Sequence, residues 1–150
     1  MGQIVKQLFF NAPVEMVWKV WTDVTKTPEW VEGVQESRIT GPVKEGKGLS
    51  WQEKCLFGKN VIQMDHEFVE WEPLTRTVTQ TGLPMGGTME CKTEFRQTEQ
   101  GAQVDLQLEW DLGMVGAIIG EEKLQHMMEK TLNLTAEKWK AKVEGATPPS

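Results

Sequence analysis

Residues 102–111 alternate strictly between apolar and polar side chains, and this alternation is the strongest structural signal in the chain. The intervening positions are polar or charged, and the apolar ones are Ala102, Val104, Leu106, Leu108 and Trp110. Successive side chains of a β-strand point to opposite faces of the sheet, so this strand has one apolar, buried face and one polar, solvent-exposed face. Such a strand belongs to an antiparallel sheet that another element covers on one side.

Turn residues divide the chain before this strand into further segments with a period of two. Pairs such as Gly41-Pro42 and Glu72-Pro73 mark the breaks, because glycine and proline favour turns over sheet interiors. A first strand is expected over residues 3–10, at the start of the chain. The other six are expected near residues 34–40, 48–56, 61–71, 75–82, 88–98 and 102–111.

Apolar residues with helical spacing follow the first strand. After Pro13, apolar side chains recur at helical intervals from Val14 to Trp21, and proline is favoured at the first position of a helix. A second short helix is expected over residues 25–30, again with a proline near its start. These two segments predict a pair of short helices between the first and second strands.

The C-terminal stretch from Val115 to Glu144 contains no proline and predicts one long helix. Its apolar side chains fall on one face, and they are Leu124, Met128, Leu132, Trp139 and Val143. We expect this face to cover the dry side of the sheet. The order of elements fits a single domain over residues 1–150.

Charge and composition exclude several classes of function. The formal net charge is -6, which weighs against partners such as nucleic acid that need a basic surface. No apolar run reaches the roughly 18 residues of a membrane helix, and the first residues do not resemble a signal peptide. We therefore expect a cytoplasmic protein without stable membrane insertion. Two separate cysteines and two histidines predict no structural metal site, and no motif indicates a cofactor.

Four short segments carry a resemblance to a known family. They are Phe10–Trp18, Pro28–Val31, Gly46–Gly48 and Glu70–Pro73. Together with the long final helix they resemble the polyketide cyclase/dehydrase and lipid-transport family of the START-like (Bet v 1-like, SRPBCC) superfamily. The resemblance implies an α+β helix-grip fold. In this fold a seven-stranded antiparallel sheet wraps around a long C-terminal helix, with two short helices after the first strand.

The resemblance also implies a cavity for hydrophobic molecules between sheet and helix. Flexible methionines suit adaptable apolar surfaces, although each methionine taken alone is better explained as core filling. Some members of the family are enzymes and others only bind, so the fold by itself does not choose a function. The residues expected to line a cavity are Trp51, Met64, His66, Phe68, Met89, Phe95, Leu108, Trp110, Leu124 and Met128.

His66 and Glu53 are the two candidate catalytic residues. His66 shares a strand face with Met64 and Phe68, so it could donate to a ligand or transfer protons near neutral pH. Alternatively, it is a core histidine bonded to a backbone carbonyl, or a bulge reverses the strand, because Trp71 has the opposite phase. Glu53 could be a buried carboxylate with a raised pKa, but a wet position on an edge strand is the preferred interpretation.

Seven tryptophans and no tyrosine limit the polar groups that a pocket can contain. A donor or acid must come from another side chain, and Arg38, Arg76 and Gln80 are candidates at the mouth of the pocket. Because no phenol is present to supply an acid, we favour binding over catalysis.

The leading functional hypothesis is binding, with or without transport, of a small hydrophobic ligand, such as a lipid or polyketide, between the sheet and the C-terminal helix. The rival is a cyclase or dehydratase in which His66, together with Glu53, moves protons on a bound substrate. A third alternative is an interaction module with a filled core, which predicts no cavity larger than a few water molecules. The sequence does not define the ligand or the oligomeric state.

Overall fold

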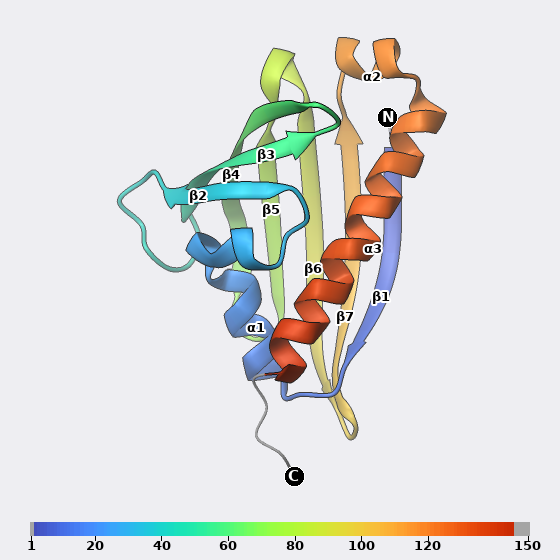
Figure 1. The fold of residues 1–150 in the computed structure, drawn as a ribbon. Helices are drawn as coiled ribbons and strands as arrows, with labels where there is room; N and C mark the ends of the chain where they lie inside the picture. The colour runs from blue at the N-terminus through green and yellow to red at the C-terminus, as the bar shows by residue number, and fades with distance from the viewer. Residues whose placement is uncertain (1, 146–150) are drawn as a thin grey trace.

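A seven-stranded antiparallel sheet curls around a long C-terminal helix in the computed structural model, which describes residues 2–145 (Figure 1). The order of strands across the sheet is β1-β7-β6-β5-β4-β3-β2. This is the α+β helix-grip fold that the sequence predicts. The strands are β1 (Gly2–Phe10), β2 (Val34–Ile39), β3 (Ser50–Phe57), β4 (Asn60–Glu72), β5 (Arg76–Gly82), β6 (Thr88–Thr98) and β7 (Gly101–Asp111).

Two short helices connect β1 to β2, as expected. They are α1 (Val14–Thr22) and the 3-10 helix η1 (Val24–Glu29). A second 3-10 turn, η2 (Pro84–Gly86), lies between β5 and β6. The buried residues of α1 are Val14, Val17 and Trp18. These positions form the apolar face that the helical spacing indicates.

The C-terminal region contains two helices, so the prediction of one helix from Val115 to Glu144 is wrong. The helices are α2 (Met114–Ile119) and α3 (Glu121–Gly145). Gly120 separates them with a φ of +95°, a conformation that glycine adopts without the clash that a Cβ would cause. As a result, α2 is set off from the axis of α3 at one end of the molecule (Figure 1). Among the described residues, no helix is long and apolar enough to cross a membrane.

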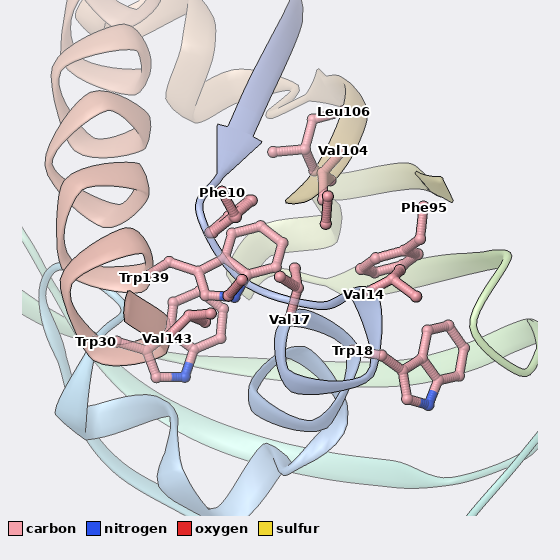
Figure 2. Close-up of a cluster of buried hydrophobic side chains, with 12 residues drawn as sticks. Phe10, Val14, Val17, Trp18, Trp30, Phe95, Val104, Leu106, Trp139 and Val143 are labelled. Carbon is pink, nitrogen blue, oxygen red and sulfur yellow. The ribbon is translucent and has the colours of Figure 1, made fainter. Parts of the chain in front are cut away.

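Aromatic side chains fill the space at the end of the sheet near α1. The ring of Trp139 from α3 lies 4.9 Å from the rings of Phe10 and Trp21, and 5.2 Å from that of Trp30, measured between centroids. Figure 2 shows Trp139 and Trp30 among the buried apolar side chains of this core. This packing joins α3 to α1 and to the first strand, and it closes that end of the molecule.

A β-bulge in β4 explains why both faces of this strand contain large apolar residues. Phe68 pairs with Thr79, but Glu70 pairs with Val78, so Val69 is an extra residue in β4. The bulge lets Phe68 and Trp71 both face inward, where their ring centroids are 5.1 Å apart. The residues of β4 before the bulge therefore keep the alternation between inward and outward side chains that the sequence predicts.

Gly101 provides a test of the close contact between β7 and the end of β1. A Cβ at this position would lie 2.0 Å from the carbonyl oxygen of Phe10. We expect Gly101→Ala to lower the free energy of unfolding by about 3 kcal/mol or more, because backbone on both sides must move. Urea denaturation measures this loss. The control Gly58→Ala has a φ of +63° and open space around its Cβ, so it should cost only about 1 kcal/mol. Equal losses would contradict the steric explanation.

Candidate functional site

A cavity of about 300 Å³ lies between the inner face of the sheet and α3. Side chains from β1, from β3 to β7, from α1 and α3, from the first turn of α2 and from the two 3-10 segments line it. The lining is mostly apolar, and the volume lies at the lower end of the ~300–1,000 Å³ typical of small-molecule sites. The gap between sheet and helix is therefore not completely filled by side chains.

Seven of the ten residues expected to line a cavity do so. Four of them lie on β3 and β4, two lie on β6 and β7, and one lies on α3. They are Trp51, Met64, His66, Phe68, Met89, Leu108 and Met128.

The other three expected residues are buried but do not line this cavity. Phe95 packs against Trp18, with ring centroids 5.0 Å apart, in the core near α1. Trp110 and Leu124 pack with Leu112 in a separate buried cluster. Strand and helix phase indicated correctly that these side chains point inward, but phase does not distinguish a filled region from a cavity.

Glu53 and His66 meet in the wall of the cavity. Nε2 of His66 donates to Oε1 of Glu53 over 2.7 Å. Thr27 and Trp51 donate to Oε2 of the same carboxylate, over 2.5 Å and 3.2 Å. Nδ1 of His66 lies 2.6 Å from the hydroxyl of Thr81. Side chains from η1, β3, β4 and β5 thus form one connected polar cluster in a mostly apolar wall.

The preferred interpretation of Glu53 as a wet position on an edge strand is wrong. Its side chain is buried, at 4% exposure, because β2 pairs with the outer side of β3 and occupies the edge instead. Burial raises the pKa of Glu53, but hydrogen bonds and charge from His66, together with the donors Thr27 and Trp51, outweigh it. The net pKa is therefore lowered, opposite to the expected direction, and the carboxylate stays ionised.

His66 faces inward, and its partners are side chains rather than a backbone carbonyl. It is 8% exposed, and its ring stacks on that of Trp51 with centroids 5.0 Å apart. Both ring nitrogens are engaged, one by Glu53 and the other by Thr81. The structure thus brings the two candidate catalytic residues together on one side of the cavity.

Sequence reasoning missed Thr27 and Thr81. A signal for Thr81 exists, because Thr77, Thr79 and Thr81 alternate along β5 and all three are buried. Such a row of hydroxyls on an inward strand face indicates polar partners inside. No comparable signal marks Thr27, whose role depends on how η1 packs against the sheet.

The model of one protein family matches residues 1–144 of the chain. Its description is polyketide cyclase/dehydrase and lipid transport. The chain belongs to this family. Sequence comparison with curated proteins gives no match, so the family model and the fold carry the relationship.

Solved structures share the fold of this polyketide cyclase/dehydrase family member at low sequence identity. A START superfamily protein from Mycobacterium smegmatis is 16% identical with a TM-score of 0.73, covering 97% of this chain and 99% of its own. The Zhui aromatase/cyclase from Streptomyces sp. R1128 is 13% identical with a TM-score of 0.73, and the coverages are 96% and 92%. A conserved protein from Geobacillus kaustophilus is 13% identical with a TM-score of 0.80, and the coverages are 96% and 95%. At these identities the likeness establishes the fold alone.

The two arginines of this family member that were predicted at the mouth of the pocket form polar contacts elsewhere. Arg38 donates to Gln52 over 2.7 Å, and Arg76 pairs with Glu70 over 3.1 Å. Gln80 is exposed on β5 and lines a more open groove. None of the three lines the cavity.

The two cysteines line the cavity but are not activated. Burial raises the pKa of the Cys55 thiol and of the Cys91 thiol to about 11. A thiol of this kind stays protonated at neutral pH and is a poor nucleophile. Within residues 2–145 no cluster of histidine, cysteine and acidic side chains is arranged to hold a metal ion.

The lowered pKa of Glu53 predicts a pH-dependent contribution to stability. A carboxyl group whose pKa falls on folding stabilises the folded state above its ordinary value of 4.5, and this contribution is lost as the pH falls further. We expect Glu53→Gln to lower the free energy of unfolding by about 3 kcal/mol at neutral pH, because it removes one partner of a buried pair. The difference from the unsubstituted protein should shrink below pH 4.5. Urea titrations at several pH values measure it, and a constant difference down to strongly acidic pH would contradict an ionised Glu53.

Proposed function

We propose that this protein binds a small hydrophobic molecule in the cavity between its sheet and α3. The observation that carries the proposal is the cavity of about 300 Å³, whose mostly apolar wall contains the buried ionisable pair Glu53 and His66. Apolar walls with a few fixed polar groups are typical of small-molecule sites. The apolar lining would supply affinity, and the polar cluster would orient the ligand.

The volume limits the size of the ligand. An apolar protein cavity of ~150 Å³ accommodates benzene, so about 300 Å³ has space for roughly two fused rings or a single short chain. A two-tailed lipid would need a much larger space. Within the classes predicted from the sequence, the volume favours a polyketide-like or single-chain ligand.

The end of the cavity opposite the aromatic core is the proposed entrance. Leu56, Pro84 and Val115 line the cavity there, and the turn between β5 and β6 lies at the same end of the molecule as α2 (Figure 1). Nearby Met85 and Ile118 are 67% and 77% exposed. Apolar side chains exposed around an opening would guide a hydrophobic ligand inward.

Catalysis by His66 and Glu53 is the second candidate function, because both residues line the same cavity. An enzyme of the cyclase or dehydratase type would use the imidazole to move a proton on the ligand. However, Glu53 and Thr81 already engage both ring nitrogens. A substrate would have to displace one of them, so the geometry supports binding better than proton transfer.

An interaction module with a filled core is supported least. A water molecule takes up ~30 Å³ of liquid, so the cavity of about 300 Å³ exceeds the space of a few waters. An internal space of this size would serve no purpose in a protein that acts only through its outer surface.

Filling the cavity tests the proposed function. Met128 lies on the cavity side of α3 and is half-buried, whereas Lys130 is exposed on the same helix. Met128→Trp should place an indole in the cavity and weaken binding of prodan, a neutral two-ring fluorophore, by about tenfold or more, while Lys130→Trp should leave it unchanged.

Fluorescence titration of prodan measures both variants against the unsubstituted protein. Thermal unfolding shows that each variant is folded. Absence of saturable prodan binding to the unsubstituted protein would contradict the proposal, as would equal affinities for the two variants.

A further inference from the structure

The charged side chains that line the cavity are acidic, apart from His66 when it is protonated. Glu53 and Glu32 contribute carboxylates, and among the described residues no lysine or arginine lines the cavity. Glu32 lies at the rim, where Lys138 neutralises it through an ion pair. Inside the cavity, the charge of Glu53 is balanced only when His66 is protonated.

The hydrogen bonds around Glu53 show that its oxygens act as acceptors. The hydroxyl of Thr27 and the indole N–H of Trp51 both donate to Oε2, and His66 donates to Oε1. A carboxylate offers about four acceptor sites on its two oxygens. Three are used, so Oε1 keeps one acceptor site beside the cavity.

Donors are scarce in the same wall. Neither ring nitrogen of His66 is free, and the hydroxyl of Thr81 is paired with one of them. The indole N–H groups of Trp30 and Trp139 have no partner in the described chain, but protein atoms enclose both nitrogens. The hydroxyls of Thr79, Thr131 and Thr135, which also line the cavity, can donate or accept and set no preference.

We propose that the cavity selects neutral or cationic hydrophobic ligands that carry a hydrogen-bond donor, such as a phenol, alcohol or amine. It rejects carboxylates and phosphates of the same size, because they would bring a second negative charge next to Glu53, where His66 is already bonded to Glu53 and Thr81 and the described lining offers no lysine or arginine. This inference rests on the proposed binding function. It excludes free fatty acids and acidic polyketides from the expected ligands.

Four two-ring probes that differ in one substituent test the selection. They are naphthol (a neutral donor), naphthylmethylamine (a cationic donor), methoxynaphthalene (neutral, without a donor) and naphthoate (an anion). In isothermal titration at neutral pH, naphthol and the amine should bind most tightly. Methoxynaphthalene should bind about fivefold more weakly, and naphthoate at least about thirtyfold more weakly.

A matched pair of variants assigns the selection to Glu53. Glu53→Gln removes the charge inside the cavity, so the affinities for naphthol and naphthoate should come within about threefold of each other. Glu67→Gln makes the same change of charge next to His66 in the sequence, on an exposed position of β4, and should leave the preference unchanged. If Glu53→Gln does not fold, the four affinities of the unsubstituted protein still decide the question.

The outcomes separate the inference from the proposed function. Naphthoate binding as tightly as naphthol would overturn the selection and leave the binding function intact. Loss of the preference in Glu67→Gln would also overturn it, because the outer surface would then set the preference. Binding of none of the four probes would overturn both.

Discussion

A buried carboxylate needs donors around it, and this requirement organises the centre of the molecule. Glu53 receives hydrogen bonds from Thr27, Trp51 and His66, and His66 in turn contacts Thr81. Since an unpaired buried charge is strongly unfavourable, η1 and three neighbouring strands must keep this arrangement. The same cluster holds the buried charge of Glu53 in a fixed position in the cavity wall.

The cavity results from uneven filling of the space between sheet and helix. Near α1, rigid rings such as Trp139 and Trp21 stack closely, with centroids 4.9 Å apart, and bound the cavity at that end. Toward α2 the facing side chains are flexible ones, such as Met64 and Met128, and they line an open volume. A fold shared at 13% to 16% identity does not define the ligand, so the chemistry of this wall is what distinguishes the protein.

Local pattern in the sequence was sufficient for the strands, the two short helices after β1 and the family, but not for the break between α2 and α3. The alternation over residues 102–111 correctly indicates which side chains of β7 face inward, because strand geometry has a fixed period. Proline and glycine pairs mark the turns for a similar local reason. The pocket histidine could also be proposed from its strand phase, with Phe68 as its neighbour on the same face.

Only the tertiary structure decided which inward side chains form the site. Phe95 and Leu108 both face inward, but one is packed against Trp18 and the other lines the cavity. Glu53 is buried because β2 covers the edge of the sheet, a pairing that no local pattern specifies. Periodicity reports the face on which a side chain lies. What lies opposite that face depends on residues far away in the sequence, and therefore burial, partners and pKa follow only from the assembled fold.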